Sequence, residues 1–268
     1  MIVFPNAKIN VGLRITSKRP DGFHELESVF YPVNWKDVLE VNESEKLSFV
    51  STGIEIPGKG SNNLCVKAFE LIKEAYDIPN VKIHLHKNIP IGAGMGGGSS
   101  DGAFMIKALN KLFKLKLSLD KQIELASKLG SDCPFFILNK PCYVEGVGNI
   151  MKPFDISLKG FKVILVYPKL HIDTSWAYAQ IIPEKSESNW QKELFKPVKD
   201  WKAIKNDFEI TIFDREPVIE NIKKKLYAQG AYYASMSGSG STVFAIFDRE
   251  KVVDLSPYNK FQTCIHEE

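Results

Sequence analysis

The chain has 268 residues, of which 44% are hydrophobic and 25% are charged, which is typical of a soluble globular protein and excludes a disordered or fibrous one. The 35 Lys and Arg residues against 32 Asp and Glu residues give a formal net charge of only +3, too small a surplus for a dedicated nucleic-acid-binding protein. A chain of this length forms one large domain or two smaller ones.

Hydrophobic periodicity and capping residues predict several elements along the chain. In chain order these are a helix over 64–76, a strand over 81–86, a helix that starts at 99–101, a helix over 118–129, a helix that starts at 131–134, a strand over 161–167, a helix over 217–230 and a strand over 242–247. Asn62, Asn63 and Ser118 are expected at N-caps, as are Ser99, Ser100 and Asp101.

Two segments interrupt this pattern. The polar stretch from Pro183 to Asp200 is expected to be a loop, and Gly146–Gly160 is the best candidate for a boundary between two lobes, which would then span 1–150 and 151–268. The order of helices and strands lacks the regular alternation of a parallel sheet. The sequence therefore predicts the α+β class.

The four cysteines, at positions 65, 133, 142 and 264, are scattered, and none has the spacing of zinc ligands. Isolated cysteines are typical of reduced thiols, which favours a cytoplasmic protein. Residues 1–5 have neither the basic region nor the apolar length of a signal peptide. No apolar run approaches the ~18 residues of a membrane span, so we expect no contact with a membrane.

A glycine-rich segment between the strand at 81–86 and the next helix indicates a phosphate site. Glycine lets the backbone approach a ligand closely, and a helix N-terminus offers N–H groups and a positive dipole end. A flexible surface turn is the weaker alternative. Gly92, Gly94 and Gly97 match the dinucleotide fingerprint, but no βαβ unit with an acidic residue ~20 positions later is evident. Gly98 stands where a P-loop has its lysine.

This segment, PIGAGMGGGSS, resembles the motif P-x-x-x-G-[LM]-G-x-[GS]-S-S of the GHMP kinase superfamily. It comprises Pro90, Ile91, Gly92, Ala93, Gly94, Met95, Gly96, Gly97, Gly98, Ser99 and Ser100. Five further stretches resemble, in the same order, motifs of the branch of the superfamily that acts on cytidine-diphosphate methylerythritol, at residues 7–10, 19–24, 129–136, 145–148 and 237–241.

The resemblance implies a GHMP kinase fold. It implies an ATP-binding first lobe similar to the second domain of ribosomal protein S5, over residues 1–150. The second lobe, over residues 151–268, would be ferredoxin-like, with the active site in the cleft between the lobes. ATP and Mg²⁺ are the implied cofactors.

Asp132 occupies the slot of the family's catalytic aspartate, which accepts the proton of the hydroxyl that is phosphorylated. From the residues alone, Asp132 is a common helix-capping aspartate. The resemblance also places the ammonium of Lys8 near Asp132 and the acceptor, where a cation lowers the pKa of the hydroxyl. In a short apolar strand, a solvated surface lysine is the alternative.

The stretch at 19–24 resembles the branch of the superfamily whose substrate is cytidine-diphosphate methylerythritol. On this resemblance, Asn10, Phe23 and His24 line the cytidine pocket. His24 would bind the cytosine edge, and Phe23 and Tyr178 would stack on the base. Tyr178 is equally consistent with the core face of an amphipathic helix over 174–182. Because the family often has Tyr at the Phe23 position, a hydroxyl contact is missing here.

The remaining implied residues have plain alternatives. Asn63 and Lys87 fall near the adenine side, although Asn63 is also a helix cap and Lys87 a solvated charge. Gly238 and Ser239 belong to a second loop near the phosphates, or to an ordinary turn. No metal ligand is assigned, and Ser100 is the nearest candidate for magnesium. His84 and His86 share one strand face but lack a third ligand, so we expect surface residues there.

The function that the resemblance implies is transfer of the ATP γ-phosphoryl group to the 2-hydroxyl of cytidine-diphosphate methylerythritol by a monomer or homodimer. Three alternatives stay open: a related kinase acting on mevalonate, homoserine or a sugar; a nicotinamide-dependent oxidoreductase; and a non-enzymatic nucleotide- or RNA-binding module. The residues at 21–24 argue against the first alternative, and the presence of both Lys8 and Asp132 argues against the last.

Overall fold

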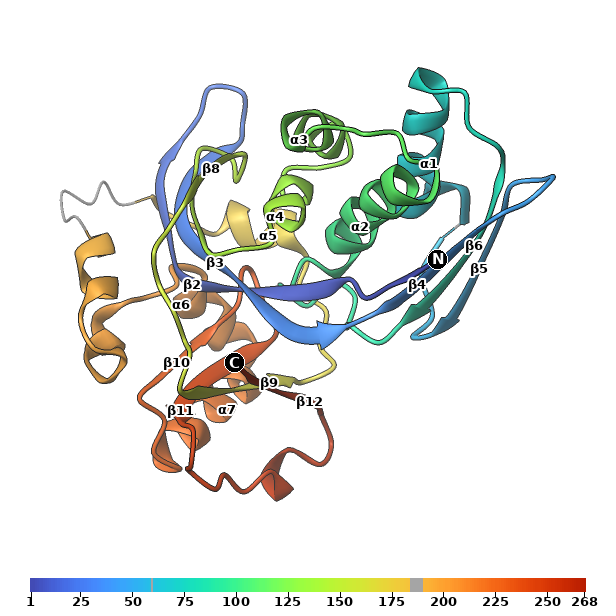
Figure 1. The fold of residues 1–268 in the computed structure, drawn as a ribbon. Coiled ribbons are helices and arrows are strands. Elements are labelled where there is room, and N and C mark those ends of the chain that lie inside the picture. Colours follow the sequence, from blue (N-terminus) through green and yellow to red (C-terminus); the bar gives the residue numbers. More distant parts are fainter. Residues whose placement is uncertain (59, 184–189) are drawn as a thin grey trace. The chain divides into compact units, whose positions relative to one another are not determined.

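The computed structural model describes residues 1–58, 60–183 and 190–268, and Figure 1 labels its helices and strands. The described residues form two compact units. The first unit consists of residues 1–7, 35–91 and 96–140, and the second of residues 8–34, 92–95 and 141–268. The predicted division into lobes at residue 150 stays a prediction.

The first unit is built on a four-stranded sheet with the order β1-β4-β6-β5. The strands are β1 (Ile2–Val3), β4 (Val38–Glu43), β5 (Ser48–Gly53) and β6 (Val81–Lys87). β6 is antiparallel to β4 and parallel to β5. Its residues alternate between buried and more accessible positions, so the strand predicted from period-two alternation is confirmed.

Four helices accompany this sheet: α1 (Leu64–Ala75), α2 (Gly97–Leu112), α3 (Leu119–Ser127) and α4 (Cys133–Leu138). A 3₁₀ turn at Gly60–Asn62 precedes α1. The predicted N-caps Asn63 and Ser118 are confirmed, because their side chains accept hydrogen bonds from the backbone N–H groups of Cys65 and Lys121. The helix predicted to reach residue 129 ends at Ser127.

The predicted capping of α2 is wrong. The N-cap is Gly96, whose φ of 68° lies in the left-handed region, and α2 begins at Gly97 without a side-chain cap. Ser99, Ser100 and Asp101 therefore already lie inside the helix, past the position from which a side chain caps the first N–H groups.

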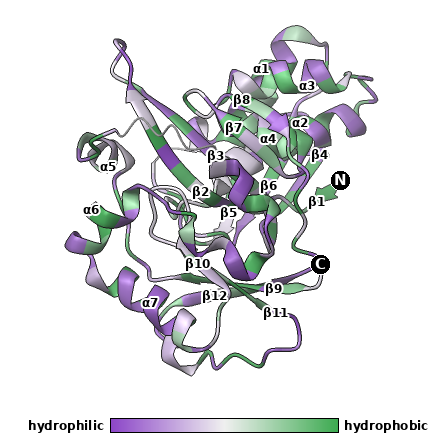
Figure 2. Cartoon of the chain, turned by 90° about the vertical axis from the view of Figure 1, so that its left-hand side faces the viewer, coloured by the Kyte–Doolittle hydropathy of each residue, from purple (hydrophilic) through white to green (hydrophobic). Residues whose placement is uncertain are grey.

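The second unit contains two four-stranded sheets. One has the order β2-β3-β7-β8, with strands β2 (Asn6–Lys18), β3 (His24–Lys36), β7 (Cys142–Glu145) and β8 (Ile150–Pro153). The other has the order β10-β11-β9-β12, with strands β9 (Phe161–Tyr167), β10 (Tyr233–Met236), β11 (Val243–Asp248) and β12 (Gln262–Glu267). The central strand β11 is almost entirely buried and largely apolar (Figure 2).

The β9–β12 sheet has the ferredoxin-like arrangement. Counted from β9, its spatial order is 2-3-1-4, and its pairs β10–β11, β11–β9 and β12–β9 are antiparallel. Between β9 and β10 the chain forms α5 (Thr174–Ala179), α6 (Phe208–Arg215) and α7 (Pro217–Ala228), and a 3₁₀ turn at Ser256–Tyr258 lies between β11 and β12. The predicted elements at 161–167 and 217–230 are confirmed.

The segment expected to be a loop is only partly irregular. Residues 184–189 lie outside the described part of the chain, and 3₁₀ helices form at Trp190–Phe195 and Val198–Ala203. Trp190 and Trp201 are buried, so apolar side chains hold this polar stretch against the second unit. Among the helices in residues 1–58, 60–183 and 190–268, none is long and apolar enough to cross a membrane.

Candidate active site

The first half of the glycine-rich loop, residues 92–95, belongs to the second unit and is held by its carbonyl groups. The carbonyl of Met95 accepts a hydrogen bond from the backbone N–H of Lys8 at 3.0 Å. The carbonyl of Gly94 accepts one from the Ser237 hydroxyl at 2.8 Å. Gly94 has a φ of +76°, and a Cβ atom there would lie 2.0 Å from the carbonyl oxygen of Ser237. Only glycine allows the two loops to approach this closely.

Lys8 is a buried cation at the start of β2. Its side chain is 4% exposed, so the alternative of a solvated surface lysine is wrong. The Nζ atom donates to Oδ1 of Asn10 at 2.5 Å and lies 4.0 Å from the centroid of the Phe30 ring. Asn10 in turn donates to the hydroxyl of the buried Ser28 at 3.0 Å. The structure therefore brings together two of the predicted residues, Lys8 and Asn10, beside the loop at Met95.

Asp132 lies in the first unit at the N-cap of α4. Its backbone is in the αR region, and its carboxylate makes no cap hydrogen bond, so capping does not account for this aspartate. The next residue, Cys133, is buried and hydrogen-bonds with Ser99 of the glycine-rich segment, and burial raises the pKa of its thiol to about 11. This contact joins the start of α4 to the first turn of α2.

Two buried oxygen atoms in the first half of α2 have no protein partner within the described residues. They are the hydroxyl of Ser100 and Oδ1 of Asp101. A buried polar group without a partner costs free energy, and such groups cluster at sites that bind a ligand or ion. Hard oxygen donors of this kind suit Mg²⁺.

Lys87 is 3% exposed, so the alternative of a solvated charge is wrong here too. Its Nζ atom bonds to the carboxylates of Asp37 and Asp101, the latter at 2.9 Å. Asp37 also accepts hydrogen bonds from the N–H groups of Asn88 and Ile89 at 2.6 and 2.8 Å. Burial raises the pKa of Asp101, because two carboxylates share one ammonium group away from water.

In this cluster the side chain of Lys87 ties the end of β6 to α2. A Cβ atom on Gly97 would lie 3.2 Å from the Lys87 Nζ atom, so the ammonium is beside the start of the helix. Asn63, the other residue predicted for the adenine side, uses its side-chain oxygen to cap α1, accepting from the N–H of Cys65 at 2.9 Å.

Two of the residues predicted to line the cytidine pocket are in aromatic contact in the second unit. His24 and Tyr178 stack with their ring centroids 5.2 Å apart and an interplanar angle of 25°. Burial lowers the pKa of His24, with a smaller contribution from Lys18, which favours the neutral imidazole. A neutral imidazole offers one donor and one acceptor. Phe23 is 64% exposed. Among the predicted pocket residues, the stacking partner of Tyr178 is His24.

Tyr178 lies on α5 and also meets the buried ring of Phe208 edge to face at 4.9 Å. It is half-buried, so the alternative of a residue on the core face of the helix describes part of its surroundings, and stacking of Tyr178 on a base stays a prediction. His84 and His86 instead hydrogen-bond to the hydroxyl of Thr52, each at 3.0 Å. No group of three or more potential metal ligands occurs among the residues that the structure describes.

Sequence reasoning missed the side chains that hold these loops. Asp37 and Asp101 around Lys87, and Asn206 and Glu209 around Met236, are all buried. The one local signal was the Asn206-Asp207 pair, because Asn and Asp are the residues that precede helices. Their partners are distant in the sequence, so no spacing rule identified them.

Comparison with known families defines the class of protein. The family described as "GHMP kinases N terminal domain" matches residues 63–140. The family described as "GHMP kinases C terminal" matches residues 193–255. A solved structure of mevalonate kinase from Methanococcus jannaschii superposes with a TM-score of 0.76 over 100% of this chain and 98% of that one. Its 15% identity shows a shared fold.

Two further comparisons are more specific. The 4-diphosphocytidyl-2-C-methyl-D-erythritol kinase of Bacteroides fragilis is 50% identical over 258 residues, which cover 94% of each chain. A crystal structure of 4-(cytidine 5'-diphospho)-2C-methyl-D-erythritol kinase has a TM-score of 0.85 at 29% identity and covers 99% of this chain and 98% of that one. The chain therefore belongs to the GHMP kinase family and, within it, to the family of 4-diphosphocytidyl-2-C-methyl-D-erythritol kinases.

Proposed function

We propose that this chain transfers the γ-phosphoryl group of ATP to the 2-hydroxyl of 4-diphosphocytidyl-2-C-methyl-D-erythritol, giving the 2-phosphate and ADP. The observation that carries the proposal is the buried Lys8–Asn10 pair beside the glycine-rich loop, with Lys8 hydrogen-bonded through its backbone to Met95. In phosphoryl transfer the protein mainly positions the groups and stabilises charge. A buried ammonium next to a phosphate loop supplies such stabilisation.

Asp132 is the proposed general base, and Lys8 the cation that favours the ionised form of the acceptor. A carboxylate at this position is a suitable acceptor for the proton of a hydroxyl, a role that accelerates reactions by roughly 10²–10⁴-fold, and it is not used as a helix cap. Lys8 would lower the pKa of that hydroxyl, because an adjacent positive charge favours the anionic form.

The glycine-rich loop, Pro90–Ser100, is proposed to bind the phosphates of ATP. Its carbonyls at Gly94 and Met95 are engaged by the protein, so its N–H groups are what it offers to an anion. The N-terminus of α2 adds the positive end of a helix dipole. Magnesium would neutralise phosphate charge when bound, and the unpartnered hydroxyl of Ser100 fits an oxygen ligand for it.

For the cytidine moiety, we propose that His24 hydrogen-bonds to the base edge and that Phe23 or Tyr178 stacks on the base, with Asn10, Gly238 and Ser239 nearby. Asn63 and Lys87 stay proposals for the adenine side. For Lys87 the proposal rests on its backbone or stem, since its ammonium binds two carboxylates. The reduced thiols of this chain support a cytoplasmic location, and a monomer or homodimer stays an expectation.

The decisive experiment measures ADP release with 4-diphosphocytidyl-2-C-methyl-D-erythritol, mevalonate and homoserine as separate acceptors. We expect ADP release with the first alone. Asp132→Asn should lower kcat by about 10²–10⁴-fold while ATP binding, measured by calorimetry, persists. Lys8→Met should behave similarly.

Asp120→Asn is the matched control, because Asp120 is an exposed aspartate in the first turn of α3. Equal ADP release with all three acceptors would contradict the proposed substrate. Near-normal turnover in Asp132→Asn would remove Asp132 from the mechanism.

A further inference from the structure

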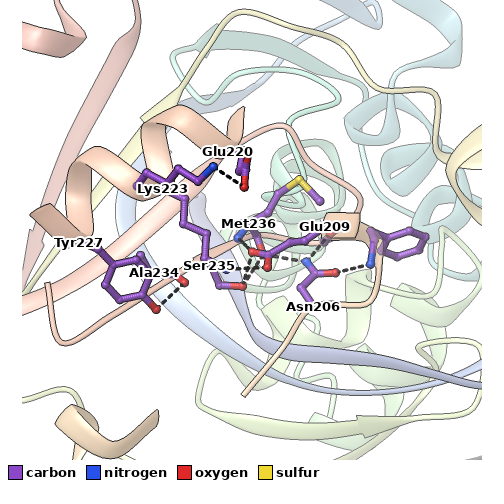
Figure 3. Close-up of polar contacts among 11 residues, drawn as sticks. Asn206, Glu209, Glu220, Lys223, Tyr227, Ala234, Ser235 and Met236 are labelled. Carbon is purple, nitrogen blue, oxygen red and sulfur yellow. Dashed lines mark hydrogen bonds and ion pairs between the residues drawn. The ribbon is translucent and has the colours of Figure 1, made fainter. Parts of the chain in front are cut away.

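A buried polar cluster in the second unit hydrogen-bonds to the backbone next to and within the turn at residues 237–241. Its members come from three separate segments: Asn206 and Glu209 at the start of α6, Lys223 on α7, and the end of β10 (Figure 3). Asn206 and Glu209 are 2% and 8% exposed. Burying such groups is costly unless their hydrogen bonds are made, so the cluster exists because its partners are in place.

Asn206 binds the backbone on both sides of the turn. Its amide nitrogen donates to the carbonyls of Met236 and Gly238, each at 2.8 Å, and its oxygen accepts from the N–H of Phe208 at 3.0 Å. Three hydrogen bonds from one side chain fix the distance between the start of α6 and the turn. Removing the amide would leave two buried carbonyls without this donor.

Glu209 makes a second attachment to the same backbone. Its Oε1 atom accepts from the Met236 N–H at 2.8 Å and from the Ser235 hydroxyl at 3.1 Å. Its Oε2 atom pairs with Nζ of Lys223 at 2.6 Å. The lysine thus compensates the buried carboxylate, while the other oxygen holds the end of β10.

The segment that carries Asn206 is itself attached to β2. Leu13 donates to the carbonyl of Lys205 at 3.0 Å and accepts from the N–H of Asp207 at 2.9 Å, so the two segments form a short parallel bridge. The carboxylate of Asp207 also accepts from the N–H of Ile15 at 2.7 Å. β2 is the strand that carries Lys8 and Asn10, so one segment touches both the strand and the turn.

The turn at residues 237–241 is hydrogen-bonded to the glycine-rich loop, so its position affects the position of that loop. The Ser237 hydroxyl donates to the carbonyl of Gly94 at 2.8 Å and accepts from the backbone N–H of Asn10 at 3.2 Å. A shift of Met236–Gly238 by a few tenths of an ångström would therefore move the Gly94 carbonyl and, with it, the neighbouring N–H groups that are proposed to bind the phosphates.

We propose that Asn206 and Glu209 are positioning residues for phosphoryl transfer, which set the place of the Ser237 turn and, through it, of Gly94 and Asn10. This inference rests on the proposed kinase function. Neither residue needs to touch substrate. Their effect should appear in kcat, because small displacements of positioned groups weaken transition-state stabilisation more than binding.

The test compares Asn206→Ala, Glu209→Ala and the conservative Glu209→Gln with the wild type. We expect kcat per folded molecule to fall at least about tenfold in the two alanine variants, with KM for ATP changed less. Glu209→Gln retains an oxygen that accepts from Met236 and should recover most of the lost kcat. Glu220→Gln is the matched control. Glu220 lies on α7, the helix that carries Lys223, and forms an exposed ion pair with Lys224 of that helix.

A readout that does not depend on turnover is amide hydrogen exchange of residues 237–240 and 92–95. We expect faster exchange in both segments of Asn206→Ala, and unchanged exchange in Glu220→Gln. If Asn206→Ala does not fold, Glu209→Ala and Glu209→Gln carry the same comparison. Wild-type exchange and kcat in the alanine variants would overturn the proposal. An inactive wild type with faster exchange in the variants would instead contradict the proposed kinase function.

Discussion

The Lys87 cluster allows a sharp test of what holds the first unit together. Lys87→Met removes the ammonium between Asp37 and Asp101 while keeping most of the apolar stem. All three side chains are at most 3% exposed, so water cannot replace the lost partner. Removing one member of a buried ion pair costs about 3–5 kcal/mol.

That range converts into a thermal shift. For chains somewhat shorter than this one, 1 kcal/mol corresponds to about 2–4 °C in Tm, so Lys87→Met should lower Tm by roughly 6–20 °C. The double variant Lys87→Met/Asp101→Asn should be more stable than Lys87→Met alone, because it carries one buried carboxylate fewer. The assay is thermal unfolding followed by circular dichroism at pH 7.

The control for this prediction is Lys121→Met, which breaks an exposed pair with Glu124 and should leave Tm close to the wild-type value, since surface pairs contribute little. A Tm for Lys87→Met as close to wild type as that of Lys121→Met would refute the reasoning. A double variant that is less stable than Lys87→Met would also refute the reasoning, because the loss of stability in Lys87→Met would then not come from leaving two buried carboxylates without their cation.

Two further predictions follow from the same geometry. Because burial raises the pKa of Asp101 above its ordinary value, the folded state binds more protons than the unfolded state as pH rises from ~4, and stability should fall as pH rises above that value. Asp101→Asn should flatten that slope in urea unfolding, and an unchanged slope would contradict the assignment. Tyr178→Ala should raise KM for the cytidine substrate about tenfold, since stacking on a base is worth ~1–3 kcal/mol, whereas Tyr178→Phe should retain the wild-type KM; equal KM in both variants would exclude a stacking role.

Much of the fold was predictable because its signals are local. Asn63 precedes α1 and caps it, and the alternation over 81–86 is that of β6, since a cap and a period-two pattern depend on neighbouring residues. The start of α2 was predicted less well. Gly96 takes the N-cap position with a positive φ, and the hydroxyls of Ser99 and Ser100, which look like caps, lie inside the helix.

For the candidate site as well, some features could be predicted from the sequence and others could not. The glycine-rich segment could be predicted as a phosphate site because its glycines lie close together in the sequence, whereas Lys8 and Asp132 were selected by their resemblance to GHMP kinase motifs, and the roles of all three stay proposals. The sequence did not indicate which charged side chains become buried on folding. Lys8 and Lys87 each had a solvated alternative, and folding buries both.

Only the tertiary structure decided the partners of those buried groups. Lys87 meets carboxylates 14 and 50 residues away, and Ser237 meets Gly94 at a separation of 143 residues. Hydrogen bonds and ion pairs of this kind form wherever packing excludes water and leaves a polar group to be satisfied. That requirement depends on three-dimensional neighbours, so no pattern along the chain expresses it.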